Sequence, residues 1–173
     1  MSVITFSTKF PAYHPKAGQP TYFVEKILSG LLKMESKGLA DAIYESRKWL
    51  SCNDVDSFLE VVESQTPKFH TIRAGHRFKV GDMFSPRIWS GRPYNSKQII
   101  LAPDLKVEKV WNFEIYKEGI ILTNKEGELY GSPSLWGDLA KNDGLELKDF
   151  LDWFQYPKPF KGQIICWSKN VNY

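Results

Sequence analysis

The chain is poor in cysteine, with only Cys52 and Cys166 among its 173 residues. They lie far apart, and a chain of this length buries enough apolar surface to fold without disulfides or a structural metal. The first ten residues, MSVITFSTKF, lack the charged start and apolar run of a secretory signal, so we expect a cytoplasmic protein. No apolar run approaches the roughly 20 residues that cross a bilayer, so we expect no membrane partner.

Motifs for metals and nucleotides are missing as well. The three His and two Cys are scattered along the chain and give no zinc-binding spacing. Neither G-x-x-x-x-G-K-[ST] nor G-x-G-x-x-G is present. The sequence therefore predicts no metal, no cofactor and no nucleoside-triphosphate chemistry.

Positive charge, in contrast, is concentrated in one segment. Residues 68–97 hold seven Lys or Arg, one acid and five aromatics, whereas the whole chain has a net charge of only +3. Cationic side chains neutralise phosphates, and flat rings stack on unpaired bases, so this segment predicts RNA or another nucleic acid as partner. A pair of strands with a solvated basic face would have the same composition, and composition alone leaves both interpretations open.

The hydrophobic pattern predicts an α+β chain. Apolar residues at helical spacing predict helices at about 21–33, 36–50, 53–64, 135–141 and 147–154. Short β-prone runs between turn residues predict strands at 3–6, 84–89, 97–101, 107–116, 119–123 and 162–167. We expect a mixed, mainly antiparallel sheet or small β-barrel flanked by helices. No repeat or linker divides the chain, so 1–173 is predicted to be a single domain with a helical hairpin inserted at about 31–67.

The densest group of reactive side chains is Lys68-Phe69-His70-Thr71-Ile72-Arg73. In an extended segment, alternation places Lys68 and His70 on one face and Thr71 on the other. A turn at Phe69-His70 would instead bring Lys68 Nζ near Thr71 Oγ, as proton transfer from the hydroxyl requires. A lysine and a threonine at this spacing are common in proteins, so both geometries stay open. His70 could pass protons or simply be hydrogen-bonded.

The order of the short motifs resembles the ASCH family of PUA-like barrels. A helix ends in Ile27-Leu28-Ser29-Gly30, Lys68-x-x-Thr71-Ile72-Arg73 follows, and Lys79-Val80-Gly81-Asp82 opens a strand. An acid, Asp143, then falls near the C-terminal helix where the family has one. The resemblance covers about 3–30 and 68–167. The family's Gly and Lys are normally nearly adjacent, whereas about 37 residues separate them in this chain.

The resemblance implies a small barrel whose cleft binds RNA or a modified nucleoside. Some small bacterial relatives are N4-acetylcytidine amidohydrolases that work with a Lys, a Thr and a Glu. Lys68 and Thr71 match the first two, whereas Asp143 matches the Glu only approximately, because Asp is one methylene shorter. On this interpretation Lys68 is the general base, Thr71 is the nucleophile, and Asp143 orients Lys68 or protonates the leaving amine.

A second group of candidate residues runs from Ser85 to Gln98 and resembles a basic-aromatic hairpin. Alternation places Arg87 and Trp89 on one face, which suits a phosphate contact beside a stacked base. Alternatively, Trp89 and Tyr94 pack inside the barrel and the arginines are solvated outside it. The nucleic-acid or ligand contacts that we expect are Arg73, Arg87, Trp89, Arg92, Lys97 and His70.

Three functions follow from these patterns. The first is a non-catalytic domain that binds RNA or another nucleic acid through a basic-aromatic cleft. The second is a hydrolase that deacetylates a modified nucleoside through Lys68, Thr71 and Asp143. The third is a protein-interaction domain that uses the 31–67 insertion. Its signature would be an exposed apolar stripe formed by Leu39, Ile43, Trp49 and Phe58.

Overall fold

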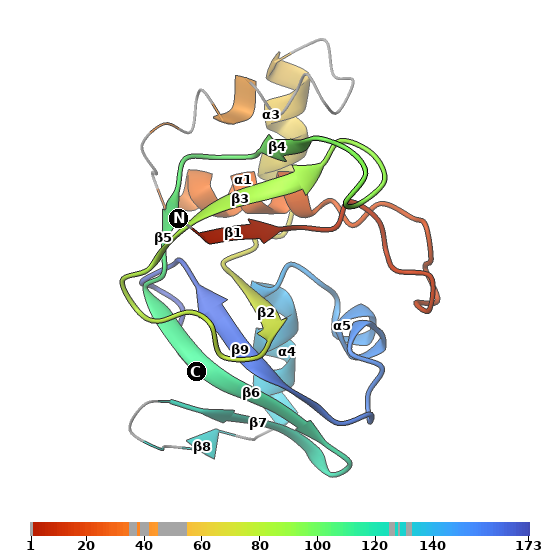
Figure 1. Ribbon diagram of the computed structural model, residues 1–173, viewed down its shortest axis with the longest axis vertical. Helices are drawn as coiled ribbons and strands as arrows, with labels where there is room; N and C mark the ends of the chain where they lie inside the picture. The colour runs from red at the N-terminus through yellow and green to blue at the C-terminus, as the bar shows by residue number, and fades with distance from the viewer. Residues whose placement is uncertain are drawn as a thin grey trace.

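The computed structural model describes residues 2–34, 38, 42–44, 55–124, 127, 129–130 and 133–173. It is an α+β fold with two mostly antiparallel sheets (Figure 1). Its described helices are α1 (Phe23–Lys33), α3 (Val55–Ser64), α4 (Pro133–Asn142) and α5 (Leu147–Trp153). No helix in these ranges is both long and apolar enough to cross a membrane.

The smaller sheet has the strand order β1-β3-β4, with β5 paired to another part of β3. Its strands are β1 (Ser2–Thr5), β3 (Met83–Trp89), β4 (Gln98–Ile100) and β5 (Leu105–Lys106). The strand β1 runs parallel to β3, and the pairings of β3 with β4 and β5 are antiparallel. This arrangement leaves β1 at one edge of the sheet.

The larger sheet is antiparallel throughout and has the order β2-β9-β6-β7-β8. Its strands are β2 (His70–Ala74), β9 (Phe160–Cys166), β6 (Lys109–Tyr116), β7 (Gly119–Thr123) and β8 (Leu129–Tyr130). The edge strand β2 is followed in the chain by the loop that leads to β3. Pairings between the described strands give two sheets and no closed barrel, so barrel closure stays a prediction.

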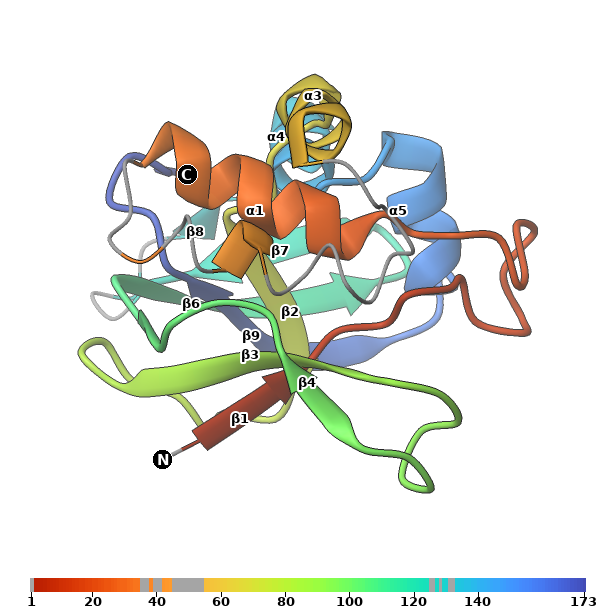
Figure 2. The ribbon, with the colours of Figure 1, turned by 90° about the horizontal axis from the view of Figure 1, so that it is seen from above.

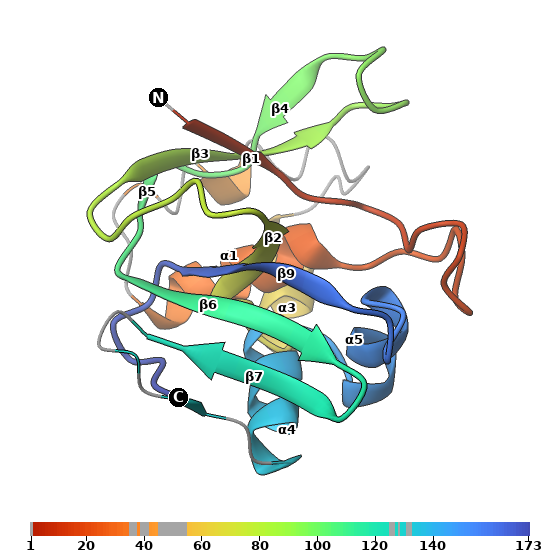
Figure 3. The ribbon, with the colours of Figure 1, turned by 60° about the horizontal axis from the view of Figure 1, so that its bottom comes forward.

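The helices lie on one side of the molecule and the strands on the other (Figure 2). The two edge strands β1 and β2 face each other across the space between the sheets (Figure 3). Apolar side chains from all layers form one core, which includes Leu28 of α1, Phe84 of β3, Phe113 of β6 and Ile164 of β9. The single predicted domain is therefore built from two sheets that share a core with the helices.

The predicted elements agree with most of the described ones to within a few residues. One difference concerns the start of α1, which the sequence places at about residue 21 and the structure at Phe23. The N-cap is Tyr22, in a left-handed conformation with φ 56°, and no side chain caps the helix. The Thr21 hydroxyl still accepts a hydrogen bond from the amide of Phe23, at 3.3 Å. The short strands β5 and β8 were not predicted, because two residues give no usable periodicity. The strand β2 was not among the predicted strands either, because residues 68–73 were left open between an extended segment and a turn.

The predicted insertion is described only in part. Most of its first helix, at about 36–50, lies outside the described residues, as do Leu39 and Trp49. The second predicted helix is present as α3, which packs against α1. Ile43 and Phe58 are 6% and 2% exposed and belong to the core. Both therefore contradict the predicted apolar interaction stripe, because they face inward.

Helix α1 lies unusually close to the segment between α3 and β2. A Cβ added to Gly30 would lie 2.5 Å from the carbonyl oxygen of Lys68. The Lys68 amide also donates a hydrogen bond to the Lys26 carbonyl at 2.8 Å. Because a backbone oxygen cannot rotate away as a side chain can, this position requires glycine. The helix and Lys68 thus make direct contact although the insertion separates them in sequence.

We predict that Gly30→Ala lowers the free energy of unfolding by about 1–3 kcal/mol, because the new methyl overlaps the Lys68 carbonyl. The matched control is Gly137→Ala in α4, where an added Cβ would meet nothing within 4 Å. That substitution should stabilise the protein by up to about 1 kcal/mol through helix propensity. Urea unfolding measures both changes, and equal effects of the two substitutions would contradict the close approach.

Candidate functional site

Lys68 is almost completely buried, with 1% of its surface exposed. Its Nζ donates one hydrogen bond to the Asp143 carboxylate (Oδ1, 2.5 Å) and one to the Asp143 carbonyl (2.7 Å). The same ammonium lies 4.3 Å from the centroid of the Phe23 ring. Burial lowers the pKa of Lys68 to about 8, against the opposing attraction of the Asp143 carboxylate.

Asp143 is positioned by the C-terminal end of α4. The amide of Leu145 bonds the Ala140 carbonyl, and the amide of Gly144 bonds the Lys141 carbonyl. With Gly144 at φ 74°, these bonds form a Schellman motif that ends the helix at Asp143. The Lys68 ammonium is therefore placed at the negative end of the helix dipole, which favours a cation there. Burial raises the pKa of the Asp143 carboxyl, and the nearby Lys68 charge opposes that rise.

His70 lies in the same buried cluster. It is fully buried, and its Nδ1 is 3.6 Å from Asp143 Oδ1, which is too far for a hydrogen bond. Within the described part of the chain, neither ring nitrogen has a hydrogen-bond partner of ordinary geometry. Burial and the nearby Lys68 charge lower the pKa of His70 well below 6.5, so the ring is neutral at pH 7. As predicted for an extended segment, Lys68 and His70 approach the same carboxylate.

Thr71 occupies the next position of β2, opposite Ile165 of β9, and is 5% exposed. Successive strand residues point to opposite faces, so its hydroxyl lies on the other side of β2 from the His70 ring. Both hydrogen bonds of Lys68 Nζ go to Asp143. The structure thus brings together Lys68, Asp143 and His70, and the pairing of Lys68 with Thr71 stays a prediction.

Arg73 links the two sheets. Its Nη2 donates a hydrogen bond to the Thr5 carbonyl on the edge of β1, at 2.6 Å. The guanidinium also lies 5.4 Å from the centroid of the Phe6 ring. Its Nε is buried and has no hydrogen-bond partner among the described residues. Burial lowers the pKa of Arg73, although the Asp143 carboxylate opposes this.

Arg87 and Trp89 lie on the same face of β3, as alternation predicts. Arg87 is partly exposed and crosses the sheet surface, where it donates hydrogen bonds to Ser85 Oγ and Gln98 Oε1 at 3.1 and 3.2 Å. The partly exposed ring of Trp89 lies 5.3 Å from that of Tyr94, which is 88% exposed. These two rings therefore form a pair at the surface and do not fill the interior.

Arg92 and Lys97 are exposed and lie in the connection between β3 and β4. In the described part of the chain, ion pairs use other cations, so the expected ligand cations Arg73, Arg87, Arg92 and Lys97 have no carboxylate partner. Lys68 differs from them, because its charge is already neutralised by Asp143. The basic segment thus presents unpaired positive charge after its first residue.

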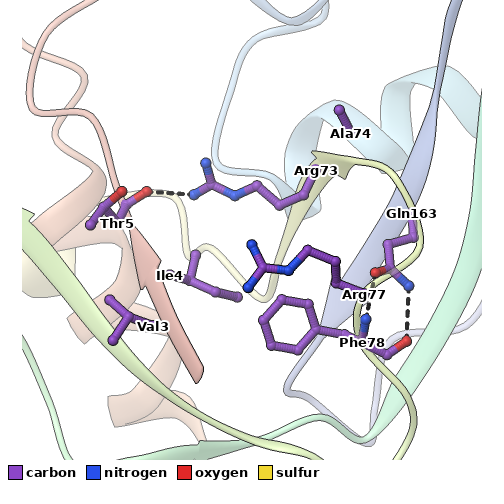
Figure 4. A pocket seen from close by; sticks show the side chains of 8 residues that line it. All are labelled: Val3, Ile4, Thr5, Arg73, Ala74, Arg77, Phe78 and Gln163. Atoms are coloured by element: carbon purple, nitrogen blue, oxygen red, sulfur yellow. Dashed lines mark hydrogen bonds between the residues drawn. The ribbon is translucent and has the colours of Figure 1, made fainter. Parts of the chain in front are cut away.

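Two cavities adjoin the N-terminal segment. One, of about 240 Å³, lies between β1 and the end of β2 (Figure 4). It is lined by Val3, Ile4, Thr5, Arg73, Ala74, Arg77, Phe78 and Gln163. The other, of about 420 Å³, is lined by Phe6, Ser7, Thr8, Lys9, Trp89, Ser90, Gly91 and Pro93. Neither lining includes Lys68, Thr71 or Asp143.

Several residues that line or support the two cavities are not among the predicted site residues. Arg77 belongs to the basic segment but was not chosen as a contact, because nothing in the sequence shows that it shares a cavity with Arg73. Gln163 falls in the predicted strand at 162–167, where a polar residue among apolar ones is itself a signal of a specific contact. Its side chain accepts a hydrogen bond from the amide of Phe78 and donates one to the Phe78 carbonyl, at 2.8 and 3.0 Å.

Within the described ranges, no group of three or more His, Cys, Asp or Glu could hold a metal ion. Comparison of the chain with family models, with curated proteins and with solved structures finds no match. The interpretation of the site therefore rests on its own geometry. That geometry separates a buried, charge-compensated cluster around Lys68 from an uncompensated basic surface with two cavities.

Proposed function

We propose that this chain is a nucleic-acid-binding domain that holds single-stranded RNA on the surface formed by β1, β3 and the segments that follow β1, β2 and β3. The observation that carries the proposal is the unpaired positive charge of Arg73, Arg87, Arg92 and Lys97. Unpaired cations next to cavities suit phosphate contacts, since binding releases the counterions of the nucleic acid. The ASCH-like order of motifs supports the proposal, and a PUA-like barrel is part of it.

Aromatic side chains supply the second element of the proposal. The larger cavity has Phe6, Trp89 and Lys9 among its lining residues, and Trp89 is partly exposed. An unstacked base could lie against an aromatic ring there while the cation contacts its phosphate. Stacking of this kind is tolerant of base identity and contributes about 1–3 kcal/mol per base. Single-stranded RNA is favoured because bases in a duplex are not free to stack on a protein ring.

Binding of a 5′-hydroxyl single-stranded RNA, measured by fluorescence anisotropy between about 50 and 200 mM salt, tests the proposal. Arg87→Ala should weaken binding and reduce the slope of log K against log salt by about 0.7, the value for one phosphate contact. Trp89→Ala should weaken binding by about 1–3 kcal/mol with the slope unchanged, because stacking releases no counterions.

Lys148→Ala is the matched control for this experiment. Lys148 is an exposed cation of α5 that pairs with Asp152 and lies on neither cavity. The Lys148→Ala variant should bind RNA as tightly as the unmodified chain does. Affinity that is independent of salt, or an equal loss in Arg87→Ala and Lys148→Ala, would contradict the proposed surface.

One observation favours a second candidate function, deacetylation of a modified nucleoside such as N4-acetylcytidine. A lysine whose pKa is lowered to about 8 can accept a proton near neutral pH. In this reaction Lys68 takes the proton of the Thr71 hydroxyl, whose oxygen attacks the acetyl carbonyl. The amine leaves with that proton, which comes directly from Lys68 or through Asp143. Water then hydrolyses the threonine ester, which releases acetate and restores the Thr71 hydroxyl. Lys68 and Asp143 are covered in this structure, so the substrate must gain access to them.

Acetate release from N4-acetylcytidine tests this second function. The rate should rise with pH through about 8, because only the unprotonated Lys68 amine can act as a base. Thr71→Val should abolish turnover and leave RNA binding unchanged, since it removes the hydroxyl while keeping the shape of the side chain. Lys148→Met should keep full activity. If the Thr71→Val variant still releases acetate, Thr71 is not the nucleophile. If the unmodified chain releases no acetate, only the binding function remains.

A further inference from the structure

The cavity between β1 and β2 contains two arginines and no acid. Figure 4 shows Arg73 extending from β2 and Arg77 from the loop that follows it, both into the cavity that faces β1. The remaining lining residues are Val3, Ile4, Thr5, Ala74, Phe78 and Gln163, none of which is charged. Two guanidinium groups line one small cavity that has no acidic side chain in its wall, so an anion bound there would be attracted by both.

Arg73 is held in place before any ligand arrives. Its Nη2 bonds the Thr5 carbonyl at 2.6 Å, and the Phe6 ring lies 5.4 Å from the guanidinium carbon. The buried Nε of the same group has no partner in the parts of the chain that the structure describes. A buried donor without an acceptor is costly, and a ligand oxygen would satisfy it. Because the guanidinium is already fixed, little conformational entropy is lost when it binds.

Arg77, the second arginine of the cavity, lies in the loop between β2 and β3, and the larger sheet holds this loop in place. The buried side chain of Gln163 makes two hydrogen bonds to the backbone of Phe78, the residue after Arg77. Arg77 itself is exposed at the cavity, and it has no carboxylate partner in the described ranges. The backbone position of Arg77 is therefore set by the larger sheet, while its side chain stays free to close on a ligand.

The charge of the site indicates which anion it takes. The Asp143 carboxylate, which attracts Arg73, is already neutralised by Lys68 at 2.5 Å. Two positive charges thus remain at the cavity. A phosphomonoester carries about −1.5 to −2 at pH 7, whereas an internal phosphodiester or a carboxylate carries only one negative charge. Arginine also forms paired hydrogen bonds to phosphate oxygens.

We propose that the cavity lined by Arg73 and Arg77 binds a phosphomonoester, namely the terminal phosphate of a nucleic-acid strand. That the ligand is a nucleic acid rests on the proposed function, whereas the preference for a terminal phosphate rests on the charge and the free donor in this cavity. Arg73 binds the phosphate through its free Nε–H, and Arg77 closes on it from the mouth of the cavity.

The test compares two single-stranded RNAs of one sequence, with a 5′-phosphate or a 5′-hydroxyl, by anisotropy. The Nε–Hε signal of Arg73 is followed by ¹⁵N NMR in parallel, during titration with inorganic phosphate and with chloride at equal ionic strength. We expect the phosphorylated strand to bind about tenfold tighter, as one charge-assisted contact provides. Phosphate should shift the Arg73 signal, and chloride should not.

Two variants test whether the preference for the 5′-phosphate arises in this cavity. Arg77→Ala should abolish the preference for the 5′-phosphate, because it removes one of the two positive charges from the cavity. Lys79→Ala is its matched control, an exposed cation two residues away that does not line the cavity, and it should keep the preference. Both substitutions are at exposed positions, so neither should disturb folding.

The outcomes separate the two proposals. Equal affinity for both strands with an unmoved Arg73 signal would overturn the phosphate site and leave RNA binding in place. If neither strand binds but inorganic phosphate shifts Arg73, the phosphate site holds and the RNA function fails. A shift of the Arg73 signal by chloride equal to that by phosphate would also overturn the site, because it would show a simple response to ionic strength.

Discussion

The contact between the Lys68 ammonium and the C-terminal end of α4 joins α1, the segment before β2 and α4. The ammonium meets a carboxylate and a carbonyl of Asp143, at the negative end of the helix dipole, with the Phe23 ring beside it. Three elements thus converge on one charge: α1, which carries Phe23, the start of β2 and the Schellman turn of α4. Removing either charged partner would leave a buried charge alone, at a cost of about 3–5 kcal/mol.

This contact also determines what the rest of the basic segment can do. Because Asp143 is used by Lys68, no carboxylate remains in the described cluster to neutralise Arg73. After Lys68 the chain continues along β2. The later cations of the basic segment lie between the edge strands β1 and β2 or on the smaller sheet. An edge strand leaves backbone groups on its outer side without a strand partner, and Arg73 binds one such group of β1, the Thr5 carbonyl. Positive charge and cavities therefore meet at β1.

Sequence reasoning predicted the described helices and most of the longer strands, because their apolar residues repeat at clear periods. For an extended segment it placed Lys68 and His70 on one face, with a turn toward Thr71 as the open alternative, and only the family resemblance placed Asp143 in the same site. It could not show the close approach of Gly30 to Lys68, since that contact spans the insertion. Nor could it show that Arg77 shares a cavity with Arg73, because their proximity depends on a loop that Gln163 holds through the Phe78 backbone. The inward orientation of Ile43 and Phe58 is likewise a tertiary effect, because helical spacing does not say which way a face points.

We propose that the N-terminal segment, the end of β2 and the β3–β4 connection form one nucleic-acid-binding surface. Amide chemical-shift mapping of the ¹⁵N-labelled chain with a single-stranded RNA at low salt tests it most directly. We expect shifts concentrated in residues 3–9, 73–78 and 87–97, which disappear when salt is added. Shifts confined to α4 and α5, or no shifts at all, would contradict the account.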